Sequence, residues 1–314
     1  MNVDWAEVEC TDFDVVIVAC GYEARSIHVV ERYSGARSLL LAVDYGSFDL
    51  GSYNVNRSVL EREQDLQWLD ARAAQFGDLV IERLTEALKL KQSEEPLRVL
   101  FDISSCSRAV IAKILLAMKA VTSEIRLTCA YAVSQWFAPP TGELPSTISE
   151  PVVGDLSGWS NDLTHPPCAV IGLGFEPGRA LGSIDYLEVP EVRLFLPQGP
   201  DKRFYEAVLD ANDLLLSEAG RDFIRYDIRD PLDLYQKLIS LTVGLISTFR
   251  PIVIPLGPKI FAALSILVAI ELEPLVCVWR VSAGEYEDVA DRSASGEVVA
   301  FEYRFPKKSV PVTS

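Results

Sequence analysis

Runs of consecutive apolar residues alternate along this chain with stretches in which apolar and polar residues recur at helical spacing. In the first half the predominantly apolar segments lie at 14–20, 39–43, 97–102 and 129–134. Between them, residues 56–91 carry apolar residues at helical spacing on a charged background. Continuous apolar strands that alternate with helices are typical of parallel strands covered on both faces, so the pattern predicts a Rossmann-like α/β layer.

The second half repeats this plan at a constant spacing. In each half an apolar strand runs into a glycine turn and a helix start; the two glycines are Gly21 and Gly174, and 174 − 21 = 153. At that offset Glu23 corresponds to Glu176 without a gap. We infer a tandem duplication. The predicted fold class is therefore α/β, with two tandem, pseudo-symmetric Rossmann-like parallel-sheet lobes.

The predicted boundaries follow from this repeat and from composition. The first lobe spans 1–137, a connector rich in Pro, Gly and Ser spans 138–167, and the second lobe spans 168–314. Residues 296–305 alternate between apolar and polar like an edge strand. We assign this strand to the second lobe.

Composition and net charge limit the kinds of molecule that this protein is expected to bind. The chain has 314 residues, of which 49% are hydrophobic and 24% charged, as expected for globular domains. Lys+Arg 29 against Asp+Glu 45 gives 29 − 45 = −16, which argues against a broad face for duplex nucleic acid but allows a small anion in a pocket. The apolar stretch 260–270 is too short to span a bilayer, and the N-terminus shows no signal peptide, so we expect a cytoplasmic protein with no membrane partner.

Histidine and cysteine usage gives no sign of a metal site. The two histidines, His28 and His165, are far apart in sequence, and the six cysteines form no Cys-x-x-Cys pattern. We expect the cysteines to be small core residues in a reducing compartment. The sequence identifies no cofactor.

Polar residues follow two strands of the first half at the points where ligands bind in open parallel sheets, beyond the carboxyl ends near the switch in strand order. The candidates are Gly21, Tyr22, Glu23 and Arg25 after the first strand, and Asp102, Ser104, Ser105, Ser107 and Arg108 after the later one. Serines at a strand-to-helix turn expose backbone N–H groups, and a following arginine adds a cation, which together favour a phosphate. Glu23 could instead hold a ribose hydroxyl or act as a general base, and Tyr22 could stack on a base.

The second half offers a counterpart set at the equivalent strand ends. Its members are Gly174, Phe175, Glu176 and Arg179 after the first strand, and Gly257, Pro258 and Lys259 after the later one. The same logic predicts ring stacking by Phe175 and a phosphate seat at Gly257 and Lys259. Because Asp102 corresponds to Pro255, the first half is the more polar.

Each of these motifs also has a purely structural interpretation. The glycines fit tight turns, and Asp102 with Ser104 and Ser105 fits a helix N-cap. Glu23 and Arg25 fit a local salt bridge at the seam of the two halves, as do Glu176 and Arg179. The residues Asp44, Tyr45 and Asp49 form a weaker acidic candidate after the second strand, where nucleotide-binding halves often carry their ribose acid.

Both strand, turn and helix segments resemble those of the CARF and SAVED sensor domains of prokaryotic antiviral systems. The segments are FDISSCSRAVIAKILLAM (101–118) and VIPLGPKIFAALSILVAI (253–270), with Arg108 and Lys259 where that family has its cation. The resemblance implies two Rossmann-like halves whose turns face a cyclic nucleotide or cyclic oligonucleotide. The chain departs from the pattern in having SSCSR instead of a Gly-Gly-Thr-Lys turn, and in Pro258, which lacks a donor N–H. No nuclease-like signature or helix-turn-helix is evident, so an effector would be another chain.

These observations predict a nucleotide-binding, sensor-like protein of a prokaryotic signalling or antiviral defence system, with an anionic nucleotide at the cleft between its lobes. Two alternatives stay open. Glu23 and Asp102 could be a carboxylate pair that cleaves or transfers an N-glycosidic bond of a nucleotide. The chain could also be a non-catalytic subunit of a larger defence complex or a homo-oligomer, which a mean hydropathy of +0.18 favours.

Overall fold

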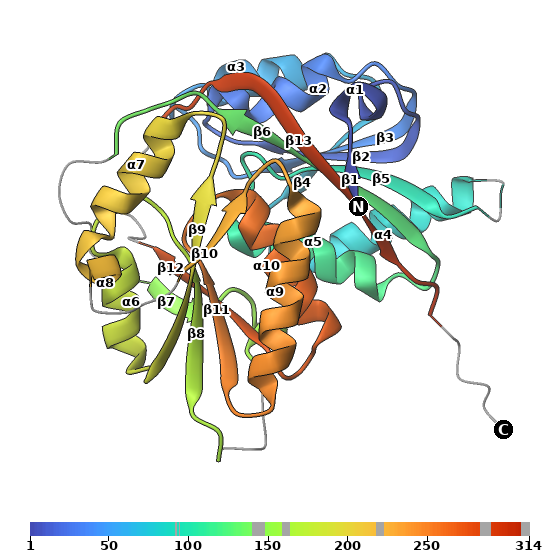
Figure 1. Cartoon of the computed structure of the whole chain (residues 1–314). Coiled ribbons are helices and arrows are strands. Elements are labelled where there is room, and N and C mark those ends of the chain that lie inside the picture. Colours follow the sequence, from blue (N-terminus) through green and yellow to red (C-terminus); the bar gives the residue numbers. More distant parts are fainter. Residues whose placement is uncertain are drawn as a thin grey trace, which may run out of the picture. The chain divides into compact units, whose positions relative to one another are not determined.

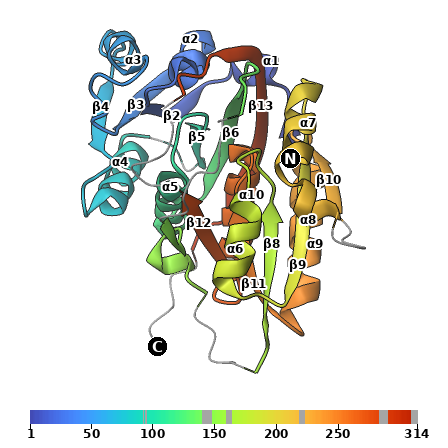
Figure 2. The same cartoon turned by 90° about the vertical axis from the view of Figure 1, so that its left-hand side faces the viewer.

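The computed structural model describes residues 1–91, 93, 95–139, 148–158, 164–217, 223–282 and 290–308. It divides into two compact units, which we call the first lobe (Met1–Gln135 with Val289–Ser314) and the second lobe (Trp136–Asp288). Each lobe has one mostly parallel sheet with helices on both of its faces (Figures 1 and 2). The predicted α/β fold with two tandem Rossmann-like lobes is confirmed.

The sheet of the first lobe has the strand order β1-β13-β6-β5-β2-β3-β4. Its strands are β1 (Asn2–Val3), β2 (Phe13–Cys20), β3 (Arg37–Asp44), β4 (Leu66–Asp70), β5 (Leu97–Asp102), β6 (Ile125–Ser134) and β13 (Ala294–Phe305). Strands β4, β3, β2, β5 and β6 are parallel. Side chains such as Val16, Leu40 and Leu100 are fully buried in its core because these central strands are covered on both faces.

Helices cover both faces of this sheet. They are α1 (Trp5–Val8), the 3-10 helix η1 (Ala24–Ile27), α2 (His28–Arg32), α3 (Tyr53–Leu60), α4 (Phe76–Leu90) and α5 (Arg108–Ala120). In Figures 1 and 2, α2 and α3 lie on one side of the sheet, and α4 and α5 lie together on the other.

The interpretation of residues 56–91 as helical throughout is wrong in its middle. Strand β4 interrupts it and pairs in parallel with β3, so that Leu69 is buried. Asp65, just before β4, has φ 58°, a left-handed conformation that ends helical geometry. The helical spacing belongs to α3 and α4 on either side, and a five-residue strand at the sheet edge adds too few buried positions to break that signal.

The sheet of the second lobe has the order β10-β9-β8-β11-β12-β7. Its strands are β7 (Ile148–Pro151), β8 (Pro167–Gly172), β9 (Glu191–Gln198), β10 (Phe223–Asp227), β11 (Arg250–Pro255) and β12 (Cys277–Ser282). Its helices are η2 (Gly154–Leu156), α6 (Arg179–Leu187), α7 (Lys202–Ala211), α8 (Asp213–Ser217), α9 (Pro231–Ile246) and α10 (Lys259–Glu271). In Figures 1 and 2, α6, α7 and α8 lie on one side of this sheet, and α9 and α10 on the other.

The two lobes exchange their outer antiparallel strands. After β6 the chain enters the second lobe, where β7 pairs antiparallel with β12; after β12 it returns to the first lobe, where β13 pairs antiparallel with β6. The assignment of the C-terminal strand to the second lobe is therefore wrong. The β13 strand buries Val298 to Phe301 against the first sheet, whereas alternation along a strand indicates only that one face is buried and does not identify the sheet.

Local geometry supports the duplication independently of the glycine turns. Strands β5 and β11 begin and end at the same offset, since 250 − 97 = 153 and 255 − 102 = 153. At the ends of β4 and β10, Asp70 and Asp227 each accept bonds from the backbone N–H and the guanidinium of the arginine two residues on. The same turn therefore occurs after the third parallel strand of each lobe.

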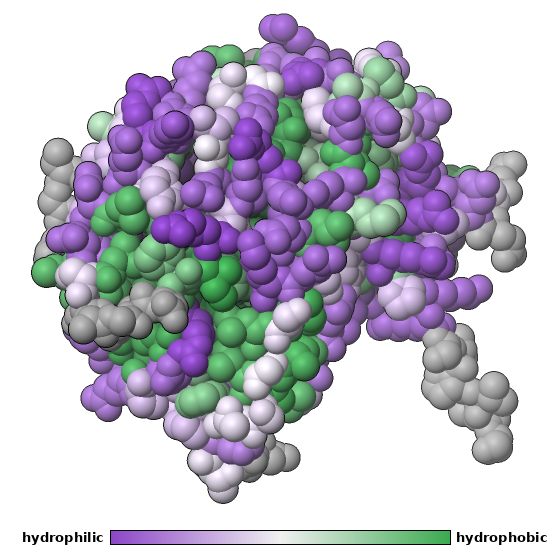
Figure 3. Space-filling model, in the orientation of Figure 1, coloured by the Kyte–Doolittle hydropathy of each residue, from purple (hydrophilic) through white to green (hydrophobic). Residues whose placement is uncertain are grey.

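Apolar residues are distributed unevenly between core and surface. Eleven consecutive residues of α10, Ile260–Ile270, are buried, and five of the six cysteines are buried too. Figure 3 shows hydrophobic surface over the part of the second lobe where α6 and α8 lie, and Leu214 of α8 is 72% exposed. Over the described ranges, no helix has the length and apolar character needed to cross a membrane.

Candidate functional site

The two predicted motifs of the first lobe meet at the point where its strand order reverses. The chain passes from β2 outward to β3 and β4, then returns to β5 on the other side of β2, so the switch lies between β2 and β5. A Cβ placed on Gly21, which follows β2, would lie 3.0 Å from the Cβ of Ser105, which follows β5. A side chain at position 21 would therefore require the Ser105 turn to shift by a few tenths of an ångström.

A buried ion pair occupies this edge. Arg25 Nε donates to Glu23 Oε2 at 2.6 Å, and the two residues are only 2% and 7% exposed. Arg25 also donates to the carbonyl of Ala132 at 3.0 Å, beyond β5, and thereby spans the switch point. Although burial alone would lower the pKa of Arg25, the Glu23 carboxylate raises it, so the guanidinium stays charged.

Residues from the C-terminal segment complete the surroundings of Glu23. Arg292 Nη1 lies 3.5 Å from Glu23 Oε1, and Arg25 N–H donates to the carbonyl of Arg292 at 3.0 Å. Asp291 accepts from the N–H of Ala24 at 2.7 Å and from the hydroxyl of Ser52 at 2.7 Å. Asp291 and Arg292 could not be predicted from the sequence, because no local pattern links residues more than 260 positions apart.

Asp102, the last residue of β5, has a carboxyl group with a raised pKa and one buried oxygen that has no hydrogen-bond partner in the described chain. Its Oδ1 accepts bonds from the N–H and the hydroxyl of Ser104, and this hydroxyl in turn accepts from the N–H of Ala132. Within the described part of the chain, Oδ2 is buried and has no hydrogen-bond partner. Burial raises the pKa of Asp102 to about 7, although the bonds from Ser104 and the charge of Arg25 oppose the rise.

At the start of α5, Ser107 already makes hydrogen bonds within the protein through both its hydroxyl and its N–H. Ser107 is the N-cap: its hydroxyl accepts from the N–H of Val110 at 3.2 Å, so the capping role considered for Asp102 belongs to Ser107. The N–H of Ser107 donates to the hydroxyl of Tyr45 at 2.8 Å. Arg108, the first residue of α5, is half-buried. A phosphate at this turn would therefore depend on Arg108 and the helix N-terminus more than on the N–H of Ser107.

Asp44, the last residue of β3, accepts hydrogen bonds from three groups of the protein itself. Asp44 accepts from the hydroxyl of Tyr53 at 2.5 Å, from Gly46 N–H at 2.7 Å and from Arg57 Nη1 at 2.7 Å. Burial opposes ionisation, but these three donors lower the pKa of Asp44. Tyr22 is half-buried and packs against the core. Asp44 is thus part of a structural cluster.

The second lobe brings its equivalent turns together with different chemistry. A Cβ on Gly257 would lie 2.3 Å from the carbonyl oxygen of Leu173, so the two turns touch. The N–H groups of Leu256 and Gly257 both donate to the carbonyl of Gly172, at 2.9 and 3.0 Å. Pro258 has no N–H, and Lys259 begins α10. The turn carries a cation, but the N–H groups of its glycine and leucine already have acceptors.

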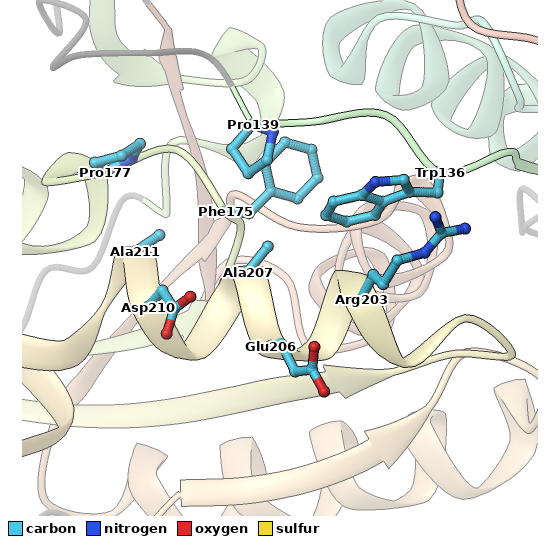
Figure 4. A pocket seen from close by; sticks show the side chains of 9 residues that line it. All are labelled: Trp136, Pro139, Phe175, Pro177, Arg203, Glu206, Ala207, Asp210 and Ala211. Carbon is cyan, nitrogen blue, oxygen red and sulfur yellow. The ribbon is translucent and has the colours of Figure 1, made fainter.

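In the second lobe the ion pair between Arg179 and Glu176 is longer than the one between Arg25 and Glu23 in the first lobe. Arg179 begins α6 and is 5% exposed, with its Nη1 3.9 Å from Glu176 Oε1. Phe175 lines a pocket beside α7 (Figure 4).

In both lobes a buried asparagine side chain donates to the backbone of the glycine turn, a contact that was not predicted from the sequence. Asn56 of α3 donates to the carbonyl oxygens of Gly21 and Glu23 at 2.8 and 2.9 Å. Asn212, at the end of α7, donates to the carbonyl of Gly174 at 2.8 Å. Each asparagine holds the glycine turn by its backbone.

Among the residues described, no group of three or more His, Cys, Asp or Glu is placed to hold a metal ion. No protein-family model matches the chain, and no curated protein matches it. Solved structures that match include phosphoethanolamine N-methyltransferase 1 of Haemonchus contortus, in complex with phosphoethanolamine and S-adenosylhomocysteine. That likeness covers 83% of this chain and 73% of the other, at 10% identity and a TM-score of 0.23. The strand orders of the two sheets define the class: an α/β protein with two tandem Rossmann-like lobes.

Proposed function

We propose that the first lobe binds a nucleotide-like anion at the carboxyl edge of its sheet, and that the chain is a sensor in a prokaryotic signalling or antiviral defence system. The observation that carries the proposal is the convergence of Glu23, Arg25 and Asp102 at the β2–β5 switch point. The sensor setting is supported by the resemblance of the strand, turn and helix segments to CARF and SAVED domains.

The chemistry of the edge suits the two parts of a nucleotide. Arg108 lies at the N-terminus of α5, where helix dipole and guanidinium charge both favour a phosphate. Asp102 Oδ2 has no protein partner in the described chain, but it is buried, so a ribose hydroxyl would reach it only after the edge opens. A buried oxygen without a partner costs free energy, and a ligand that supplies a donor recovers it.

Glu23 is poorly placed for nucleophilic attack. It is paired with Arg25 at 2.6 Å and lies 3.5 Å from both Arg292 and the hydroxyl of Ser105. A carboxylate neutralised in this way would have to break its ion pair before it could attack a sugar carbon. This geometry favours the sensor over the glycosidic enzyme.

The test is a thermal-shift and calorimetry screen of the full chain against mononucleotides, dinucleotides and cyclic nucleotides. A ligand at 100 times its Kd stabilises the folded state by about 2.7 kcal/mol, enough to detect. We expect the shift to disappear in Arg108→Ala and to persist in Arg126→Ala, which removes an exposed arginine from the opposite end of the sheet. If no nucleotide stabilises the protein, the proposal is wrong.

One observation favours the N-glycosidic enzyme as a second candidate. A carboxyl group with a pKa near 7, as for Asp102, is suited to general acid–base catalysis at neutral pH. Turnover that is lost in Asp102→Asn or Glu23→Gln while ligand binding persists would support the enzyme. Binding without turnover in the parent protein would support the sensor.

A further inference from the structure

The second lobe contains a pocket that the proposed nucleotide site of the first lobe does not use. It has a volume of about 400 Å³, within the range of small-molecule sites. It is lined by Trp136, Pro139, Phe175, Pro177, Arg203, Glu206, Ala207, Asp210 and Ala211 (Figure 4). Phe175 follows β8 and α7 follows β9, so the pocket lies at the carboxyl edge of this sheet.

The inner wall of this pocket is aromatic and held in place by further rings. Phe175 packs edge-on against Phe137, with ring centroids 5.3 Å apart, and Phe137 packs against Phe204 at 5.7 Å. Figure 4 shows Ala207 and Ala211 pointing from α7 toward the side where Phe175 and Trp136 lie. Small side chains opposite large rings leave room for a flat apolar group.

The outer rim is acidic. Glu206 and Asp210 are exposed and one turn apart on α7. The rim cation, Arg203, is paired with Asp201 at 2.6 Å and lies over the Trp136 ring at 5.2 Å. Two carboxylates beside a neutralised arginine repel a phosphate and attract N–H donors. The pocket therefore suits a ring whose face is apolar and whose edge donates hydrogen bonds.

We propose that this pocket binds a guanine-type base, with the ring on the aromatic wall and its donor edge toward Glu206 or Asp210. Guanine presents adjacent N–H donors at N1 and at the 2-amino group, which match the two oxygens of one carboxylate. Adenine presents one amino group beside an acceptor nitrogen, which faces a carboxylate unfavourably. The site is separate from the edge of the first lobe and needs no phosphate.

Calorimetry of the full chain with guanosine and with adenosine tests this proposal, because neither probe carries a phosphate. We expect guanosine to bind at least about tenfold more tightly than adenosine, the factor that one charge-assisted pair supports. The double variant Glu206→Gln/Asp210→Asn should weaken guanosine binding by about tenfold and remove the preference over adenosine. The double variant Asp185→Asn/Asp213→Asn, which makes the same charge change at exposed positions of α6 and α8 outside the pocket, should leave both affinities unchanged.

A second variant tests the space beside the aromatic wall of the pocket without altering charge. Ala211 lines the pocket on a helix and is half-buried, so Ala211→Leu should fold and fill the space. Loss of guanosine binding in this variant supports the proposal. Equal binding of guanosine and adenosine, unchanged binding in either pocket variant, or no binding of guanosine at millimolar concentration would each overturn it.

Discussion

The raised pKa of Asp102 makes the stability of the first lobe depend on pH in a defined direction. An aspartate in an unfolded chain titrates near pH 3.9, whereas burial places the pKa of Asp102 at about 7 in the folded protein. Between these values the folded state holds a proton that the unfolded state releases. The free energy of unfolding therefore falls as pH rises from about 4 to about 7, and the loss is complete above that range.

The size of this effect follows from one proton. The slope reaches about 1.4 kcal/mol per pH unit where the folded carboxyl is protonated and the unfolded one ionised. Summed from pH 5 to pH 8 with a folded pKa near 7, the loss is roughly 2.5 kcal/mol. The ionisable groups that face Asp102 are Arg25, Cys106 and Cys129; burial raises the pKa of Cys129, so it does not titrate in this interval.

The variant Asp102→Asn should remove this slope. Asparagine keeps Oδ1 as the acceptor for Ser104 but cannot titrate. The assay is urea unfolding at pH 5, 6, 7 and 8, with hydrogen exchange of β5 as the readout for the first lobe. We expect the parent to lose roughly 2.5 kcal/mol more than the variant between pH 5 and pH 8. The control is Asp78→Asn, an exposed aspartate on α4. A variant with the same slope as the parent would refute the reasoning.

Three further predictions test the ion pair, the glycine contact and the exchanged strand. Arg25→Met should destabilise the protein by about 3–5 kcal/mol because it leaves the buried carboxylate of Glu23 unpaired, and adding Glu23→Gln should recover part of that loss in chemical denaturation. Gly257→Ala should lower Tm because its Cβ would lie 2.3 Å from a backbone oxygen, whereas Gly244→Ala in α9, with nothing within 4 Å, should raise stability by up to about 1 kcal/mol. Deleting β13 should expose β6 to proteolysis while the second lobe stays resistant; equal digestion of both lobes would contradict the strand exchange.

The sequence predicted those features that repeat or that depend on neighbouring residues. The 153-residue offset located the two glycine turns, and the switch-point rule brought Glu23 and Ser105 to the same edge. The partner of β13 could not be predicted, because the β13 pattern specifies a buried face and not a particular sheet. Asn56 could not be singled out either, since in sequence it is one polar residue among many on a helix, and only the fold places a carbonyl within its reach.

The two lobes carry different side chains at several equivalent positions. Where the first lobe ends β5 with the titratable Asp102, the second ends β11 with Pro255 and follows it with backbone donors bonded to Gly172. Tyr22 and Phe175 each pack against the core of their own lobe, and Phe175 also lines a pocket. The second edge keeps charged groups in Glu176, Arg179 and Lys259, but it has Pro255 where the first has Asp102, so the two edges present different groups at equivalent positions.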